Sequence, residues 1–338
     1  MTMRHPPLSD AARGAWPAYK RDAYGILVVF AGGIAGYYLF PDSLALLTRI
    51  VSIALLVLSL DLVVGFCGVA TLGHAALYGI GAYAAGIVCL RAGITDPFLL
   101  VMIGAGAGAV AGIAMGAVLL RTHGLPQLVL SIAFVQLVQE GANKASAYTG
   151  GSDGLAGMMP APIFGVFAFD LWGRSAYLFA IFLLIAVLAI LAIVARSPFA
   201  MLCRGAKEDP VRVESLGVAI RLVLLRMYAI SGAIAGIGGA LGMLATQVVG
   251  LDGVSFELSA NALVMLALGG VGSLYGALGG TVAFMMVEHM VAAINPFHWM
   301  TVIGGLMIGV VLVAPRGLAG GLDDLQRRLF GGKSETRQ

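Results

Sequence analysis

The amino-acid sequence predicts an all-α polytopic membrane protein of about ten transmembrane helices, some short or discontinuous, with both termini in the cytoplasm. Of its 338 residues, 60% are hydrophobic and only 11% are charged, and the mean hydropathy is +0.97. Soluble domains carry about 25% charged residues, so much of this apolar surface must face lipid. Because a spanning helix needs roughly 20 mostly apolar residues, the chain has room for about ten spans with short loops.

Apolar runs of suitable length define the expected spans, and polar, glycine-rich or proline-containing segments separate them. They cover residues 23–40, 44–64, 66–90, 97–120, 125–142, 175–195, 227–248, 258–271, 273–292 and 297–314. The third, fifth, eighth and ninth are the ones expected to be short or glycine-broken. A single transmembrane domain, 23–315, therefore lies between an N-terminal tail, 1–22, and a C-terminal tail, 316–338.

Basic residues are distributed unequally between the two sides of the predicted bundle. With ten crossings, sixteen of the 20 Lys and Arg residues fall on the side of the two tails and the 196–226 loop. The other side holds four: Arg49, Arg91, Lys144 and Arg174. Since Lys and Arg accumulate in cytoplasmic loops, we expect the 196–226 loop inside and the turn-rich 143–174 loop outside. The basic N-terminal tail lacks the apolar core of a cleavable signal peptide.

Glycine is abundant, at 48 residues, and part of it follows a helical spacing. Two runs recur at intervals of four: Gly104, Gly108, Gly112 and Gly116, then Gly272, Gly276 and Gly280. Such spacing places small residues on one helix face, which lets two helices approach closely in lipid. It fits both tightly packed helices that move and ordinary static packing.

Residues suited to catalysis or nucleotide binding are sparse. Gly332, Lys333 and Ser334 resemble the end of a phosphate-binding loop, but the glycine required five residues earlier is replaced by Arg327. We therefore expect no enzyme activity, no cofactor and no metal in this chain, with ATP and Mg²⁺ held by separate subunits. Neither zinc-site nor disulfide spacing is present among the cysteines, interpreted as packing or surface residues: Cys67, Cys89 and Cys203.

Ionisable residues inside predicted spans are costly in lipid and often functional. The candidates are Asp61, His74, Glu140, Glu288 and His289. Asp61, Glu288 and His289 fit either a water-filled path or a place near a helix end, within reach of the headgroups. Glu140 lies near an outer helix end, which favours an interfacial position.

The 196–226 loop contains a short helix with clear start and stop signals. Asp209 suits the N-cap, Pro210 the first helical position, and Gly217 the left-handed residue that ends a helix. Between them lie an apolar pair on one side and a charged pair elsewhere: Val213 and Leu216, then Arg212 and Glu214. Two helical turns are unstable alone in water. The helix therefore packs either on the protein's own helix ends or in a groove on a cytoplasmic partner.

Six segments, in a fixed order, carry a resemblance to a known family. They are GHAALYGIGAYAAG (73–86), TGGSDGLAG (149–157), SPFAMLCRGAKEDPVRVESLGV (197–218), YAISGAIAGIGGAL (228–241), LGGVGSLYGALGG (268–280) and PRGL (315–318). In this order and at these spacings the chain resembles the LivM-type permeases of branched-chain amino acid ABC importers, over roughly residues 45–318.

The resemblance implies a transport function, a location and a set of partners. Such permeases are multi-pass proteins of the bacterial inner membrane that carry branched-chain amino acids or a related small solute. They pair with a second, homologous permease chain, rest on two cytoplasmic ATP-binding subunits, and receive solute from an extracytoplasmic solute-binding protein. The helix at 209–217 resembles their coupling helix, with Glu214 and Gly217 at recurrent positions. Arg212-Val213 replaces the Ala-Ala of many relatives, which changes the expected partner contacts but not the helix.

Two glycine-rich segments share the frame GxxxLYG, at 73–79 and 270–276, which hints at an internal repeat with discontinuous helices. Broken helices line the transport site in other transporters, because their free backbone groups bind ligand charges. The translocation-path candidates are therefore Gly73, His74, Tyr78, Gly79, Gly81, Gly270, Gly272, Tyr275 and Gly276. The candidates for docking the binding protein lie in the outer loop: Thr149, Gly150, Gly151, Asp153 and Gly154.

Two other interpretations stay open. An ion-coupled secondary transporter would use Asp61, Glu288 or His289 as a proton relay and would work without ATP-binding subunits. A membrane scaffold would transport nothing. The six basic residues of the 196–226 loop and its short helix favour an ATP-driven importer over both.

Overall fold

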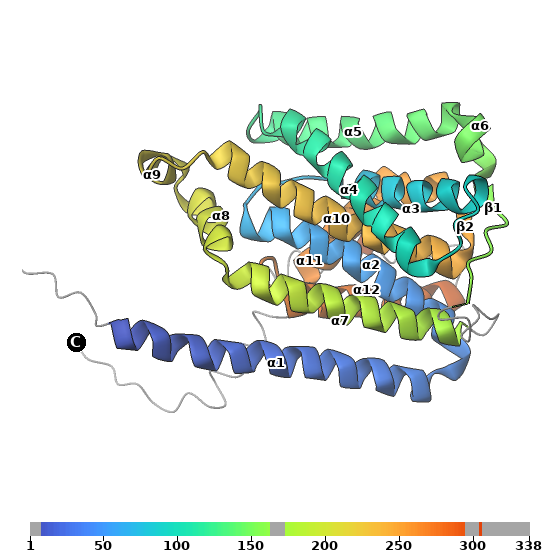
Figure 1. Cartoon of the computed structure of the whole chain (residues 1–338), viewed down its shortest axis with the longest axis horizontal. Helices are drawn as coiled ribbons and strands as arrows, with labels where there is room; N and C mark the ends of the chain where they lie inside the picture. The colour runs from blue at the N-terminus through green and yellow to red at the C-terminus, as the bar shows by residue number, and fades with distance from the viewer. Residues whose placement is uncertain (1–7, 163–172, 295–303, 306–338) are drawn as a thin grey trace, which may run out of the picture.

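The structure, a computed structural model, describes residues 8–162, 173–294 and 304–305. Its helical elements are, in order, α1 (Leu8–Leu39), η1 (Pro41–Ser43), α2 (Leu44–Asp61), η2 (Leu62–Phe66), α3 (His74–Arg91), α4 (Pro97–Leu119), α5 (Leu125–Lys144), α6 (Ser146–Thr149), η3 (Gly151–Asp153), α7 (Arg174–Arg196), α8 (Pro198–Glu208), α9 (Pro210–Ser215), α10 (Ile220–Thr246), η4 (Leu251–Val254), α11 (Phe256–Gly269) and α12 (Leu274–Ile294). Two short strands, β1 (Leu155–Ala156) and β2 (Val248–Val249), pair antiparallel. The long helices form one bundle with α8 and α9 at one end and the strands at the other (Figure 1).

The number of spans differs from the expected ten. Among the described residues, six segments are long and apolar enough to cross a membrane: Pro41–Phe66, Pro97–Leu119, Leu125–Lys144, Arg174–Arg196, Ile220–Thr246 and Leu274–Ala293. Two shorter apolar helices, Ala23–Leu39 and Phe256–Gly269, accompany them. The predominantly helical membrane fold is confirmed, and the cytoplasmic placement of the termini stays a prediction.

Two helices account for much of the difference in span count. α3 begins only at His74, so the first residues of the expected 66–90 span are not helical. α11 has 14 residues and is about 21 Å long at 1.5 Å per residue, whereas the hydrocarbon core is about 30 Å thick. It is too short to cross alone. The tenth expected span, 297–314, lies almost entirely outside the described residues.

Some helices continue past their apolar runs. α1 begins at Leu8, inside the expected 1–22 tail, and α10 begins at Ile220, seven residues before the expected 227–248 span. The Arg221 guanidinium donates a hydrogen bond to the Ala117 carbonyl oxygen of α4, at 3.4 Å. Polar residues that find such partners extend a helix beyond the stretch that hydropathy alone identifies.

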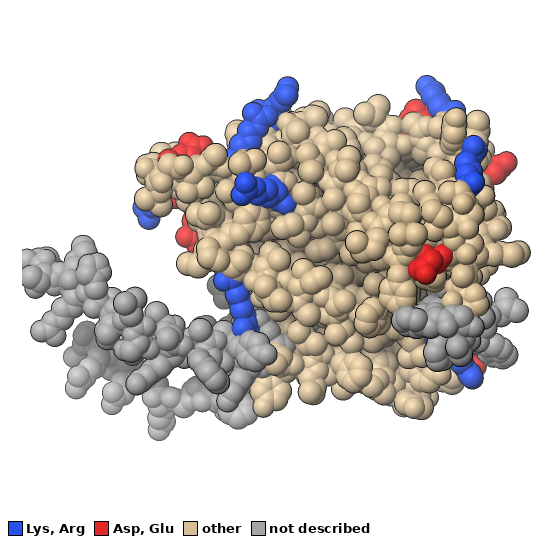
Figure 2. All heavy atoms as spheres, in the orientation of Figure 1, with Lys and Arg blue, Asp and Glu red and all other residues tan. Residues whose placement is uncertain are grey.

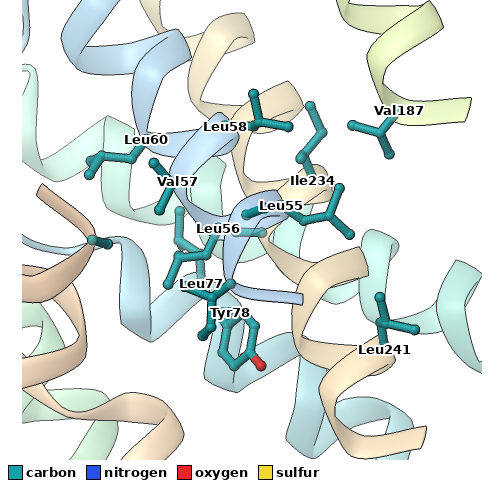
Figure 3. Close-up of a cluster of buried hydrophobic side chains, with 14 of the residues drawn as sticks. Leu55, Leu56, Val57, Leu58, Leu60, Leu77, Tyr78, Val187, Ile234 and Leu241 are labelled. Atoms are coloured by element: carbon teal, nitrogen blue, oxygen red, sulfur yellow. The ribbon is translucent and has the colours of Figure 1, made fainter. Parts of the chain in front are cut away.

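α2 is the centre of the core. Its apolar residues surround the whole helix, a pattern typical of a helix buried on every side. Leu55, Leu56, Val57 and Leu58 are completely buried. Figure 3 shows them packed with side chains from three other helices: Leu77 and Tyr78 of α3, Val187 of α7, and Ile234 and Leu241 of α10.

α4 crosses α10 at backbone contact. A Cβ added at Gly108 would lie 2.9 Å from the Gly236 Cα, and one added at Gly112 would lie 3.2 Å from the Gly232 Cα. In the second run, Gly280 of α12 packs on α11, where an added Cβ would meet the Gly269 backbone. The prediction that Gly272 shares this helix face is wrong, because Gly272 lies in the turn before α12 begins at Leu274. Close packing, the feature common to both interpretations of these runs, is therefore confirmed.

The surface has the charge distribution of a membrane protein. On the visible face, charged side chains gather toward the two ends and leave a wide belt between them (Figure 2). Large apolar side chains are exposed along the middle of the long helices, among them Met102, Val110, Leu137 and Phe182. Lipid is the environment that suits such a belt, so the chain is a multi-pass membrane protein.

Candidate functional site

The short helix predicted in the 196–226 loop is present as α9. The Asp209 Oδ1 accepts a hydrogen bond from the Arg212 backbone N–H at 3.1 Å, as expected for an N-cap. Pro210 occupies the first helical position, and Gly217 has a φ of +80°, in the left-handed region. The predicted start and stop signals are therefore confirmed, whereas the role of the helix in coupling stays a prediction.

The two faces of α9 differ from the expected arrangement. Val213 is buried against α8, 3.1 Å from the position of a Cβ added at Gly205. Leu216 is 75% exposed and Val211 is 74% exposed. The prediction that Val213 and Leu216 share one side is wrong, because α9 ends at Ser215 and the chain turns away there. Val213 packs on the protein itself, whereas Val211 in the helix and Leu216 just after its end are exposed apolar side chains.

α8 is missing from the sequence-based expectation, which treated its residues as loop. Ser197 and Pro198 carry the same cap-and-proline signal as Asp209 and Pro210. The Ser197 Oγ accepts a hydrogen bond from the Ala200 N–H at 3.3 Å. α8 therefore begins for the same physical reason as α9, and the signal was available in the sequence.

α8 is attached to the C-terminal end of α2, at η2, which is a π-helical turn. The Lys207 Nζ donates a hydrogen bond to the Gly65 carbonyl oxygen at 2.8 Å. The Arg204 guanidinium carbon lies 4.8 Å from the centre of the Phe66 ring, in a cation–π contact. Such π-helical turns often occur at functional sites. The arrangement ties the α8–α9 segment to the central helix of the bundle.

Asp61 ties the same part of α2 to a third segment. This completely buried residue accepts a hydrogen bond at its Oδ1 from the Gly272 backbone N–H, at 2.6 Å. Gly272 lies in the turn between α11 and α12, and a Cβ added at Gly65 would lie 2.7 Å from its nitrogen. The Lys207 contact from α8 and the Gly272 contact from the α11–α12 turn therefore reach the same stretch of five residues, 61–65, at the end of α2 and in η2.

The three residues proposed for a proton relay are not clustered. Asp61 contacts Gly272 just before α12 begins, whereas Glu288 is fourteen residues beyond Leu274 on that helix. At 1.5 Å per residue this separates Glu288 from the Asp61 end of α12 by about 21 Å. Glu288 is half-buried and His289 is exposed. This spacing does not favour the ion-coupled alternative.

His74, at the start of α3, is completely buried in a hydrogen-bonded chain. Its Nε2 lies 2.8 Å from the Ser231 Oγ, which donates to the Ser59 carbonyl oxygen at 2.7 Å. Since a serine hydroxyl has one proton, we assign the bonding proton to the His74 Nε2. The Nδ1 of His74 has no hydrogen-bond partner among the described residues.

Backbone groups near the start of α3 are already bonded to side chains. The Ala75 N–H donates to the Ser259 Oγ at 3.0 Å, and the Leu72 N–H donates to the Ser131 Oγ at 2.9 Å. These N–H groups are therefore occupied by protein partners rather than open to a solute. α3 and α12 both begin within a GxxxLYG segment, whereas the role of these segments in a transport path stays a prediction.

The other path candidates lie mainly at helix contacts. An added Cβ would meet Met115 at Gly73, Val254 at Gly79 and Gly236 at Gly81. The backbone of Gly276 packs on Gly269 of α11, where an added Cβ would meet it. The Tyr275 ring lies against Gly25 of α1. Gly270 and Gly272 form the α11–α12 turn with positive φ. Of the nine described candidates, only Tyr78 lines the cavity found at the strand end of the bundle.

The outer-loop candidates form a turn closed by its own hydrogen bonds. The Thr149 Oγ1 donates to the Ala142 carbonyl oxygen at 2.5 Å and accepts from the Gly151 N–H at 3.3 Å. Gly150, Gly151 and Gly154 all have positive φ, and Asp153 is exposed. The strand pair joins Leu155 to Val249, which places this turn beside the end of α10.

Comparison with known proteins assigns most of the chain to one family. The family described as branched-chain amino acid transport system / permease component matches residues 43–311. Two similar proteins are the high-affinity branched-chain amino acid transport system permease proteins LivM of Escherichia coli (strain K12) and Salmonella typhimurium (strain LT2), 27% and 26% identical over 282 residues. Each alignment covers 77% of this chain and 66% of the relative, so the chain spans about two thirds of their length. No solved structure matches the chain.

Proposed function

This chain belongs to the family of permease components of branched-chain amino acid transport systems, and on that basis we propose that it forms one half of the membrane channel of an ATP-driven importer. Its partners are a second, homologous permease chain, two cytoplasmic ATP-binding subunits and an extracytoplasmic solute-binding protein. The chain itself binds no cofactor, because ATP and Mg²⁺ belong to the ATP-binding subunits. The importer works in the bacterial inner membrane.

The observation that carries this proposal is the two-faced helix α9. Val213 fixes it to α8, while Val211 and Leu216 present apolar surface with no partner among the described residues. An amphipathic helix with exposed apolar side chains suits a hydrophobic groove on another subunit. In this proposal each ATP-binding subunit holds one such helix.

Movement of α9 is passed to the bundle through α8. The Lys207 bond to Gly65 connects α8 to the end of α2, and the Asp61 bond to Gly272 connects α2 to the α11–α12 turn. ATP binding draws the two ATP-binding subunits together, and α8 and α9 move with them. The bundle then changes from outward to inward access, which requires two arrangements of nearly equal energy.

The solute is a branched-chain amino acid or a related small amphipathic molecule. The two relatives are named for branched-chain amino acid transport, which supports the class of solute. The binding protein delivers it at the strand end of the bundle, where the turn at 149–154 provides the docking surface. This places α9 in the cytoplasm, in agreement with the distribution of basic residues.

The coupling role is tested by purifying the full complex through its ATP-binding subunits. Leu216→Asp introduces a charge where an apolar side chain would enter the groove of the ATP-binding subunit. We therefore expect at least a tenfold loss of permease retention. Leu125→Asp is the matched control, since Leu125 is equally exposed at the start of α5. Replacement of Glu214 or Gly217 is expected to weaken retention as well. Unchanged retention and unchanged uptake in all three α9 variants would remove the proposed role of this helix.

The ion-coupled alternative has a separate test. Vesicles containing only this chain are given a proton gradient, and amino-acid accumulation is measured without ATP-binding subunits. Our proposal predicts none. Accumulation under these conditions would show that the chain is a self-sufficient transporter and would contradict the proposal.

A further inference from the structure

A cavity of about 770 Å³ lies at the end of the bundle opposite α9. α10 connects the two places: it begins at Ile220, close after α9, and its last residue, Thr246, lines the cavity. Its 27 residues separate them by about 40 Å along the helix. The other walls come from α2, α3, α7, α11, β2 and η4. The volume is in the range of about 300–1,000 Å³ typical of small-molecule sites.

Two opposite charges line this cavity without being paired. Arg49 comes from the second turn of α2 and Asp252 from η4. Neither side chain forms an ion pair or a hydrogen bond within the described part of the chain. Both side chains are exposed, so each can bind a ligand in the cavity without breaking an existing contact. An unpaired cation and an unpaired anion in one cavity therefore suit a ligand that carries both charges.

The cavity also offers a polar oxygen with spare acceptor capacity. The Ser52 Oγ donates its only proton to the Gly238 carbonyl oxygen at 2.8 Å. Ser52 must then accept from the Tyr78 hydroxyl, 2.8 Å away. This leaves the lone pairs of the Tyr78 oxygen available to a donor. Because Tyr78 and Ser52 both line the cavity, a ligand ammonium group has a second acceptor besides Asp252.

The remaining walls are suited to an apolar group. Ile53, Met243 and Leu258 contribute aliphatic surface. Gln247, also in the wall, is the one described non-glycine residue with positive φ, at +54°. Strained backbone of this kind is concentrated at functional sites. The cavity thus combines a cation, an anion, a hydroxyl acceptor and an apolar wall.

We propose that this cavity is a solute site for free α-amino acids with an apolar side chain, an inference that rests on the proposed function. The Arg49 guanidinium binds the α-carboxylate, for which its planar fork is suited. Asp252 and the Tyr78 oxygen bind the α-ammonium group. Ile53, Met243 and Leu258 contact the aliphatic side chain.

The position of the cavity agrees with delivery from outside. β2 forms part of its wall and pairs with β1, which directly follows the turn at 149–154. A binding protein docked on that turn would release its solute next to the cavity. The cavity would thus be the first place on the translocation path that the solute occupies. The α8–α9 segment acts on the opposite end of the bundle.

Uptake by the reconstituted complex tests the two charges. With L-leucine delivered by saturating loaded binding protein, Arg49→Gln and Asp252→Asn are each expected to lower leucine uptake per ATP hydrolysed at least tenfold. Lys144→Gln and Glu140→Gln are matched controls, because this exposed ion pair lies at the end of α5, outside the cavity. They are expected to stay within twofold of the unchanged complex. Equal uptake by Arg49→Gln, Asp252→Asn and the controls would overturn the inference.

A second measurement does not depend on those variants. Ala245→Cys places a thiol in the cavity wall, while the three native cysteines are buried. Millimolar L-leucine is expected to slow the reaction of this thiol with a membrane-impermeant maleimide at least threefold. Leucinamide, which lacks the carboxylate, is expected to leave the reaction rate unchanged. No protection by leucine would overturn the site even if the complex transports leucine. A complex that hydrolyses ATP but accumulates no amino acid would overturn the proposed function itself.

Discussion

The α4–α10 crossing is a place where one added methyl group should lower the stability of the bundle. Gly108 faces the α10 backbone, and a Cβ added there would lie 2.9 Å from the Gly236 Cα and 3.1 Å from the Gly232 carbonyl carbon. Carbon atoms pack best at about 3.5–4.0 Å. Gly108→Ala therefore cannot be accommodated by a side-chain rotation, because the opposing atoms are backbone.

The cost follows from the separation that the methyl group enforces. The helices must move apart by roughly 0.5–1 Å, and a gap of that size forfeits a quarter to a half of each dispersion contact along the crossing. Overpacking in a close-packed interior costs about 1–3 kcal/mol. We expect Gly108→Ala to lower the free energy of unfolding by that amount.

Gly106→Ala is the matched control, because it makes the same substitution on the same helix. A Cβ at Gly106 meets nothing within 4 Å. Its effect is limited to helix propensity, worth at most about 1 kcal/mol in favour of alanine. The assay is SDS-driven unfolding in mixed micelles, followed by circular dichroism. If Gly108→Ala unfolds at the same SDS fraction as Gly106→Ala, the α4–α10 contact is looser than the structure indicates.

Three further variants test the links between the coupling segment and the bundle. Lys207→Met removes the donor to Gly65, so we expect the ATP-binding subunits to stay attached while ATP consumed per solute transported rises severalfold. Asp61→Ala leaves the buried Gly272 N–H without its acceptor, which should lower the free energy of unfolding by about 1–3 kcal/mol, measured in SDS, and Asp61→Asn should retain more stability. Asp209→Ala removes the α9 cap at a cost of about 0.5–2 kcal/mol, and faster amide hydrogen exchange across 210–215 would report it. An unchanged ATP-to-solute ratio, equal unfolding of the two Asp61 variants, or unchanged exchange would each contradict the corresponding contact.

The parts of the fold that sequence predicts well are those with local causes. α9 was predicted because Asp209, Pro210 and Gly217 act within a few residues of the helix they bound. α8 carries the same local signal at Ser197 and Pro198, so it was predictable in the same way. The span count was less predictable, since a run of apolar residues does not reveal that α11 is only 14 residues long.

The candidate sites depend on contacts between distant residues. Asp61 meets Gly272, 211 positions further along the chain, and sequence offered no reason to pair them. Arg49 was recognised only as one of four outer basic residues, and Asp252 was not singled out. Their shared cavity arises from the way α2 and η4 pack, which no local pattern contains.

Direct contact between the backbones of α4 and α10 has a mechanical consequence. Where side chains separate two helices, the helices can slide as the side chains change rotamer. Between Gly108 and Gly236 there are no rotamers to exchange, so sliding would drive carbonyl groups into each other. The two helices are therefore expected to move as one rigid body that extends from near α9 to the cavity.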